Sequence, residues 1–105
     1  MTREEMLREA VRVLVEAAAP RRIILFGSAA RGDATEASDF DFIVVERQVK
    51  SRRAEIVRLL EALEPTGIPA DVLVASESFF EEWSRVPGNV LHEARREGKV
   101  VYEAA

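Results

Sequence analysis

The sequence lacks cysteine and has one histidine, and each scarcity excludes a class of chemistry. Without cysteine there is no disulfide framework, no cysteine-ligated zinc site and no thiol nucleophile. His92 alone makes a poor metal site. No apolar run approaches the roughly 18–20 residues that a helix needs to cross a bilayer, and the charged residues 1–5 lack the apolar segment of a signal peptide. We therefore expect a soluble, cytoplasmic protein.

The sequence also lacks an excess of positive charge, since the formal net charge is −4 at pH 7. This balance argues against extended binding to nucleic acid, which needs a basic surface, but it leaves room for a small phosphate ligand held at one site. The 105 residues, 48% of them hydrophobic, are enough for one core. We expect a single domain over residues 1–105.

Hydrophobic periodicity divides the chain into alternating helices and strands. Residues 2–19 have apolar positions at helical spacing, begin with the capping-box pair Thr2 and Glu5, and end before Pro20. A second amphipathic helix is predicted at 51–63, with four residues facing inward: Ile56, Val57, Leu60 and Leu63. Shorter helices are predicted at 29–31, 76–83 and 89–97.

Short apolar runs predict strands at 22–26, 39–45 and 68–75, and an edge strand at 99–102. The first of these is apolar throughout and is expected to be buried on both faces. Residues 32–38 read as a loop. The alternation predicts an α/β (α+β) fold, in which helices pack on a small mixed sheet of three to four strands.

Gly27 and Ser28 directly follow the first predicted strand. A glycine at this point lets a ligand approach the backbone closely, and the N–H groups that begin a helix favour an anion such as phosphate. The Ser28 hydroxyl adds a further donor. The alternative is an ordinary turn in which Ser28 caps the helix.

Asp39 and Asp41 lie two residues apart at the start of the second strand, so their side chains project from the same face. Two carboxylates beside an apolar run repel each other unless a cation lies between them. Mg²⁺ suits such a pair, because it binds one or two carboxylates together with phosphate oxygens. The alternative is a solvated strand start in which Asp39 belongs to a turn.

Asp71 begins the third predicted strand and can supply a third carboxylate if that strand lies beside the second. Three acids around one or two metal ions is an arrangement used in phosphoryl transfer. The alternative is a turn residue following Pro69.

Taken together, Gly27-Ser28-Ala29-Ala30-Arg31-Gly32, followed by Ser38-Asp39-Phe40-Asp41, resembles the signature of the minimal nucleotidyltransferases, a family within the polymerase-β superfamily. The spacing and the later Asp71 also match, and the resemblance covers essentially the whole chain. It implies the nucleotidyltransferase fold.

The resemblance also implies roles for individual residues. Gly27 and Ser28 would hold the phosphates of ATP or another nucleoside triphosphate, and Asp39 and Asp41 would bind one or two Mg²⁺ ions. Asp71 would complete the metal site or act as a base. Arg31 would lie near the phosphates or stabilise the loop; its alternative role is an ion pair with Asp33 or Glu36.

Members of this family often work as the antitoxin of a toxin–antitoxin pair beside a helical HEPN-domain protein, and can adenylylate a tyrosine of that toxin. The resemblance therefore implies a nucleotidyltransferase with a HEPN partner, in a homo- or hetero-oligomer. Two alternatives stay open: a binding module that neutralises its partner by occlusion without catalysis, and a subunit of a transferase that modifies small molecules such as antibiotics. The aromatic residues Phe79, Phe80 and Trp83 are expected in the core, with a partner-docking patch as the alternative.

Overall fold

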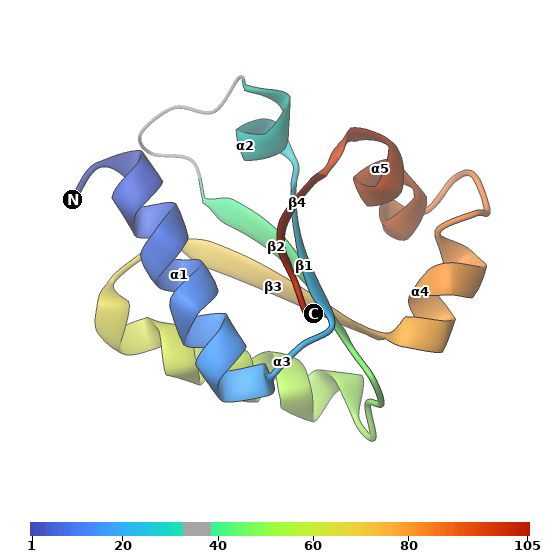
Figure 1. The fold of residues 1–105 in the computed structure, drawn as a ribbon, viewed down its shortest axis with the longest axis horizontal. Helices are drawn as coiled ribbons and strands as arrows, with labels where there is room; N and C mark the ends of the chain where they lie inside the picture. Colours follow the sequence, from blue (N-terminus) through green and yellow to red (C-terminus); the bar gives the residue numbers. More distant parts are fainter. Residues whose placement is uncertain (33–38) are drawn as a thin grey trace.

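The computed structural model describes residues 1–32 and 39–105, which form a four-stranded mixed sheet between two layers of helices (Figure 1). The strand order is β3-β2-β1-β4; β1 is antiparallel to β2 and β4, and β2 is parallel to β3. In chain order the elements are α1 (Arg3–Ala18), β1 (Arg22–Phe26), α2 (Ser28–Arg31), β2 (Phe40–Glu46), α3 (Arg52–Leu63), the 3-10 helix η1 (Glu64–Thr66), β3 (Ala70–Ser76), α4 (Glu77–Trp83), α5 (Val90–Glu97) and β4 (Lys99–Glu103). The predicted α/β fold with a mixed sheet is confirmed, and the last strand lies at an edge as expected. Of the predicted loop at 32–38, only Gly32 lies within the described residues.

Side chains at the helix starts explain where the helices begin. Thr2 and Glu5 form the predicted capping box, in which the Thr2 hydroxyl accepts from the Glu5 N–H and the Glu5 carboxylate accepts from the Thr2 N–H. Ser51, Ser76 and Asn89 cap α3, α4 and α5 in the same way, each accepting from a backbone N–H three residues ahead. None of the described helices combines the length and the hydrophobicity that crossing a membrane requires.

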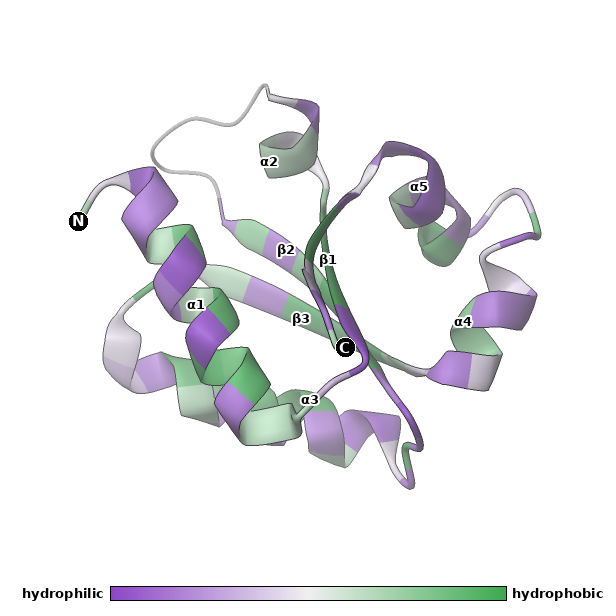
Figure 2. Cartoon of the chain, viewed as in Figure 1, coloured by the Kyte–Doolittle hydropathy of each residue, from purple (hydrophilic) through white to green (hydrophobic). Residues whose placement is uncertain are grey.

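The two helical layers pack on opposite faces of the sheet. Helices α1 and α3 cover one face, and α4 and α5 cover the other (Figure 1). Ile23 and Leu25 of β1 enter the first layer and Ile24 enters the second, so β1 is buried on both faces as predicted. Hydrophilic bands interrupt the otherwise hydrophobic strands β2 and β3 (Figure 2).

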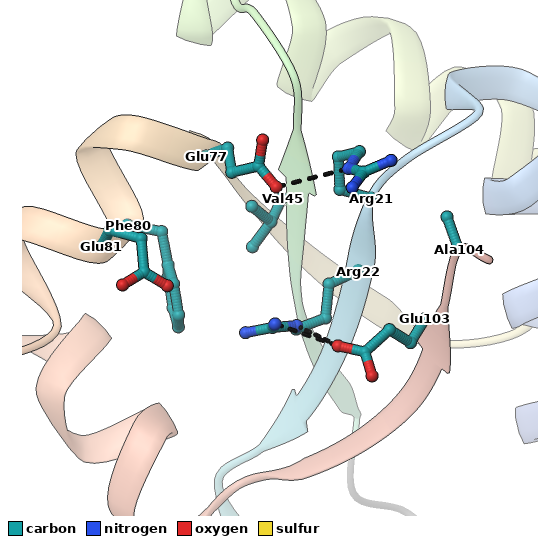
Figure 3. Close-up of a pocket in the computed structure, with 8 residues that line it drawn as sticks. All are labelled: Arg21, Arg22, Val45, Glu77, Phe80, Glu81, Glu103 and Ala104. Atoms are coloured by element: carbon teal, nitrogen blue, oxygen red, sulfur yellow. Dashed lines mark hydrogen bonds and ion pairs between the residues drawn. The ribbon is translucent and has the colours of Figure 1, made fainter.

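Two ion pairs hold together the end of the sheet where β1 begins and β2 ends. Arg21 Nε lies 3.3 Å from Glu77 Oε2 at the start of α4, and an Arg22 guanidinium nitrogen lies 2.9 Å from Glu103 Oε2 on β4 (Figure 3). They border a pocket of about 120 Å³. Both arginines are paired with glutamates, so we interpret this region as structural: its ion pairs join β1 to α4 and β4.

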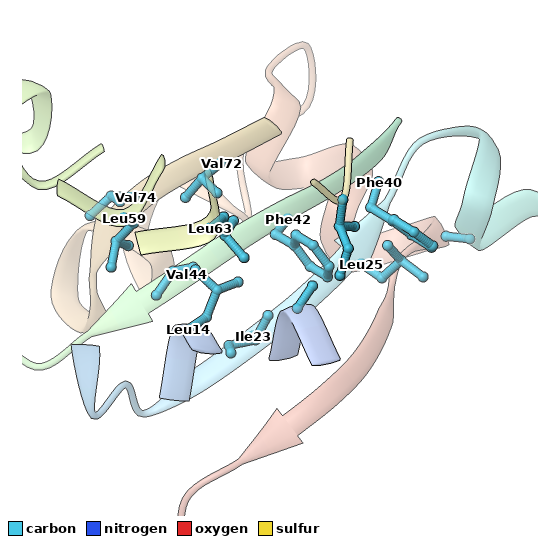
Figure 4. Packing of buried hydrophobic residues seen from close by; sticks show 13 residues of the cluster. Leu14, Ile23, Leu25, Phe40, Phe42, Val44, Leu59, Leu63, Val72 and Val74 are labelled. Atoms are coloured by element: carbon cyan, nitrogen blue, oxygen red, sulfur yellow. The ribbon is translucent and has the colours of Figure 1, made fainter. Parts of the chain in front are cut away.

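The larger core cluster lies between the sheet and α1/α3, where Phe40, Phe42, Leu14 and Leu59 are almost completely buried (Figure 4). The expectation that Val57 faces inward is wrong, because its side chain is 48% exposed. Leu59 faces inward instead, because the side of α3 that contacts the sheet is rotated about the helix axis relative to the predicted apolar side.

The aromatic residues of α4 divide between core and surface. Phe80 is 3% exposed and packs in the smaller core cluster under α4 and α5, whereas Phe79 and Trp83 are 37% and 42% exposed. The expectation of a core position is therefore correct for Phe80 and wrong for the other two. A helix that lies over a sheet buries one stripe, and Phe79 and Trp83, four residues apart, share a different one.

Candidate functional site

Three residues from adjacent strands form a row across the sheet, with Asp41 in the middle. Asp41 of β2 pairs in register with Phe26 of β1 on one side and with Asp71 of β3 on the other. Residues paired in register point to the same face, and Asp39, two positions before Asp41, belongs to that face as well. The parallel pairing of β2 with β3 thus places Asp71 beside Asp41.

The intervening phenylalanines point to the other face. Phe40 and Phe42 are buried against α1 and α3, with their rings stacked at a centroid distance of 6.1 Å. This packing fixes the register of β2, because a shift by one residue would send the aspartates into the core and the phenylalanines to the opposite face. Burial of two aromatic side chains therefore determines where the carboxylates lie.

The three carboxylates act on one another electrostatically. Burial of the half-exposed Asp41 raises its pKa, and the negative charges of Asp71 and Asp39 raise it further. Asp39 and Asp71 are exposed. The charges that shift Asp41 are all of one sign, so a cation at this position would relieve both the repulsion and the cost of burial.

Gly27 lies against Asp41. Its backbone has a φ of 72°, in the region that favours glycine, and a Cβ at this position would come within 2.6 Å of Asp41 Oδ2. The close approach to the backbone that the sequence predicts at Gly27 is therefore observed, and the group that approaches is the Asp41 carboxylate. The turn after β1 and the carboxylate on β2 face each other without a side chain between them.

Ser28 begins α2 directly beyond this turn. The first backbone hydrogen bond of α2 joins Arg31 N–H to the Gly27 carbonyl at 3.2 Å, so the N–H groups of residues 28–30 precede the helical pattern. Because α2 has only four residues, its dipole is small, and any phosphate contact depends on these individual donors and the Ser28 hydroxyl. Arg31 is exposed at the end of α2, and its predicted partners Asp33 and Glu36 lie outside the described residues.

The residues fit Mg²⁺ in their chemistry but do not form a ready-made cage. Within residues 1–32 and 39–105, no three acidic or histidine side chains are already grouped as a metal site. Mg²⁺ commonly uses one or two carboxylates and completes its shell with water and phosphate oxygens. Asp41, with Asp71 beside it and the open glycine turn opposite, meets that requirement; the metal stays a prediction.

The structure adds a feature that the sequence reasoning missed. Beyond Asp71, an open apolar pocket of about 200 Å³ lies on the same face of the sheet, between β3, α4 and α5. Leu73, Phe79, Trp83 and Val90 contribute to its lining. The sequence does contain a signal for this pocket. Phe79 and Trp83 are four residues apart and so share one side of a helix, while Phe80 lies on another side and is the one of the three that is buried.

His92 has a structural role, as its isolation in the sequence suggests. Its Nδ1 lies 3.0 Å from the carbonyl oxygen of the buried Ser84, and its backbone N–H donates to Asn89 Oδ1. These contacts join α5 to the end of α4. His92 thus anchors the helical layer and takes no part in the acidic row.

The glycine turn and the carboxylate row on this mixed sheet can be compared with the sites and folds of known protein families. The sequence profile of the nucleotidyltransferase domain matches residues 4–98, and the chain belongs to this family. No curated protein matches the sequence significantly.

Solved structures share the fold at low sequence identity. A protein from Sulfolobus solfataricus classed as a nucleotidyltransferase superposes with a TM-score of 0.66 at 20% identity, covering 94% of this chain and 78% of its own. A second match, described as a toxin–antitoxin with AMP-PNP, has a TM-score of 0.64 at 19% identity and covers 98% of this chain and 75% of its own. At such identities, the likeness establishes the nucleotidyltransferase fold.

Proposed function

We propose that this protein transfers a nucleoside monophosphate, AMP in the first instance, from a nucleoside triphosphate to a hydroxyl group of a partner protein. The observation that carries the proposal is the register of Asp41 with Asp71 and its contact with the Gly27 turn. Like-charged carboxylates that lie close together destabilise the fold, and a bound cation with its triphosphate would offset their repulsion.

Each residue has a distinct task in this proposal. The backbone at Gly27 and the N–H and hydroxyl groups of Ser28 receive the β- and γ-phosphates, with Arg31 at the outer side. Asp39, Asp41 and Asp71 would hold Mg²⁺, which when bound neutralises the triphosphate and polarises the α-phosphate. Asp71, the exposed acid at the far side of the row, is also placed to accept the proton of the acceptor.

The proposed reaction is a substitution at phosphorus. The acceptor oxygen forms a bond to the α-phosphorus, and the bond from that phosphorus to the oxygen bridging the α- and β-phosphates breaks. The electron pair of the broken bond leaves with pyrophosphate, and the hydroxyl proton passes to a carboxylate, for which Asp71 is the candidate. The product is a phosphodiester between AMP and the acceptor.

We further propose that the acceptor is a tyrosine of a HEPN-domain toxin, and that the protein acts as its antitoxin. The structural match whose description names a toxin–antitoxin with AMP-PNP supports a partner and a nucleotide, and it covers 98% of this chain. Transfer to a free small molecule is the second candidate, and the toxin–antitoxin match favours a protein acceptor over it.

The test is label transfer. The protein is incubated with α-labelled ATP, Mg²⁺ and the product of the neighbouring gene, and the label is followed on the partner. We expect a labelled partner with the unsubstituted protein and none with Asp39→Asn plus Asp41→Asn. Unlabelled partner that nevertheless binds both forms equally tightly would overturn catalysis and leave neutralisation by occlusion.

A further inference from the structure

The pocket beyond Asp71, here called the aromatic groove, is lined by Arg52, Leu73, Phe79, Trp83, Val90 and Leu91, with further backbone and side-chain atoms of β3 and α5. Phe79 and Trp83 form a tilted aromatic pair with ring centroids 5.9 Å apart. The groove measures about 200 Å³. For scale, an apolar cavity of about 150 Å³ is large enough for a benzene ring, so one aromatic side chain fits.

The groove is continuous with the acidic row. Leu73 lies two residues after Asp71 on β3, so both side chains project from the same face about 7 Å apart along the strand. The oxygen of a phenol lies closer to the centre of its ring than this separation. A phenol ring held between Leu73 and Asp71 can therefore direct its oxygen toward Asp71.

The side chains of Asn89 and Arg52 at the groove make hydrogen bonds within the fold. Asn89 Nδ2 donates to the carbonyls of Trp83 and Val86, and its Oδ1 accepts from the N–H of His92. Arg52 Nε donates to the carbonyl of Val74, and the guanidinium lies over the Phe79 ring at 5.6 Å. A purine has several polar edge atoms to satisfy, whereas a phenol has one, at its tip; the lining therefore suits a phenol better.

The groove also lies on the side from which an acceptor must attack. The phosphates of the leaving pyrophosphate are assigned to Gly27 and Ser28, at the end of β1, and the groove borders β3, with β2 between them. The attacking and leaving oxygens lie roughly in line across the α-phosphorus. An acceptor opposite Gly27 therefore approaches over β3, from the direction of Asp71 and the groove.

We propose that the aromatic groove binds the acceptor itself, a phenol-bearing side chain of a partner protein, with its ring between Trp83, Val90 and Leu73 and its hydroxyl toward Asp71. This assignment rests on the proposed nucleotidyl transfer and adds to it the residues that select the acceptor. Phe79, Trp83 and Val90 remain 37%, 42% and 40% exposed in the groove. They provide the apolar rim on which the polypeptide carrying the phenol can lie.

The only tryptophan of the chain, Trp83, lies in the groove, so its fluorescence reports on occupancy without any transfer taking place. The experiment titrates the full chain with N-acetyl-tyrosinamide, N-acetyl-phenylalaninamide, N-acetyl-serinamide or adenosine, with excitation selective for tryptophan. We expect a saturable change with the tyrosine and phenylalanine probes and none with the serine probe. Separately, melting of the same protein with Mg-ATP tests the nucleotide site, so the two assignments can fail independently.

Val90→Asp introduces a charge into the groove near the start of α5, where an acidic residue is compatible with the helix. It should weaken the tyrosine probe by about tenfold or more, because a phenol ring then covers a carboxylate. Val57→Asp is the matched control: it makes the same change at a similarly exposed valine of α3, under the opposite face of the sheet. The control should bind the tyrosine probe as the unsubstituted protein does.

Any of four results overturns the acceptor assignment. The first is a fluorescence change that stays unsaturated up to the solubility limit of the tyrosine probe. The second is an equal response to the serine probe, and the third is an equal loss of binding in both valine variants. The fourth is saturation by adenosine in place of the tyrosine probe, which would make the groove a nucleobase site.

Discussion

Strand β2 carries a carboxyl group near each end, and the fold treats the two groups in opposite ways. At its last residue, Glu46 lies beside Glu55 of α3, and burial and the contact with Glu55 raise the pKa of Glu46 to about 8. Two contacts with Arg58, at 2.8 and 2.7 Å, lower the pKa of Glu55 to about 2. The buried Glu46 Oε2 has no hydrogen-bond partner among the described residues, and a protonated Glu46 can share its proton with Glu55.

Near the start of β2, Asp41 meets two further carboxylates instead of an arginine. The charges that raise its pKa belong to Asp71 and Asp39, and the neighbouring Gly27 leaves the space beside it open. The glutamate pair is neutralised within the chain, by Arg58 and by one shared proton, whereas the charges that shift Asp41 are all negative. This difference supports the proposal that the glutamate pair is structural and that the aspartate row binds a cation.

The largest effect should come from Asp41→Asn, which keeps the shape of the side chain and removes its charge. Transfer of labelled AMP should fall by about a thousandfold, since in the proposed mechanism Asp41 both ligates the cation and faces the phosphates. The free energy of unfolding should rise by up to about 1 kcal/mol, because repulsion from Asp71 and Asp39 disappears. Label transfer and chemical denaturation measure the two effects; a large loss of stability would show that the row is structural.

Gly27→Ala tests the close approach. The added Cβ would contact Asp41 Oδ2 at 2.6 Å, and a φ of 72° is unfavourable for alanine. We expect an unfolding free energy lower by about 1–2 kcal/mol and transfer reduced by about a hundredfold. Gly67→Ala is the control, because Gly67 has a similar φ of 70° but nothing within 4 Å of its added Cβ. An equal loss of transfer in both variants would contradict the role of Gly27.

Arg58→Ala removes the cation from the glutamate pair. Arg58 also donates to the carbonyl of Ala17 at 2.7 Å, so it ties α3 to α1 as well. The unfolding free energy should fall by about 1–2 kcal/mol, while label transfer by the folded protein stays unchanged. Arg53→Ala, at an exposed position of the same helix, should change neither quantity appreciably. A loss of transfer with Arg58→Ala would remove the distinction between the two clusters.

The last prediction concerns pH and involves stability alone. Because the pKa of Glu46 is raised from an ordinary 4.5 to about 8, the folded state holds a proton that the unfolded chain releases between these values. Stability should therefore fall as pH rises from 5 to 9, by about 1–2 kcal/mol after allowing for solvent screening. In Glu46→Gln the fall should be much smaller, and in the exposed control Glu61→Gln it should persist. Melting curves at pH 5, 7 and 9 decide between these outcomes.

Much of this comparison could be predicted from the sequence because it depends on local patterns. The alternation of Asp39, Phe40 and Asp41 predicts which face each residue occupies, and the apolar run at 22–26 predicts β1 to the residue. Gly27 is identifiable as a candidate site residue because it directly follows a predicted strand and precedes a serine. These signals come from the chain's own periodicity and need no knowledge of which strands are neighbours.

Other features depend on pairings between distant segments. That Asp71 lies beside Asp41 follows from the parallel register of β2 and β3, which a resemblance can suggest but spacing cannot determine. The link between Glu46 and Glu55 likewise depends on how α3 folds back on β2. Hydrophobicity predicts Val57 and Trp83 in the core, but both are exposed, because the stripe of each helix that meets the sheet depends on tertiary packing.

Thermal melting tests the proposed binding of a nucleoside triphosphate with Mg²⁺ at the Gly27 turn and the aspartate row. A ligand that binds only the native state must stabilise it. We expect millimolar ATP with Mg²⁺ to raise the melting temperature of the unsubstituted protein, and the rise to disappear with a chelator or with Asp41→Asn. An unchanged melting temperature in the unsubstituted protein at millimolar Mg-ATP would contradict the proposed binding.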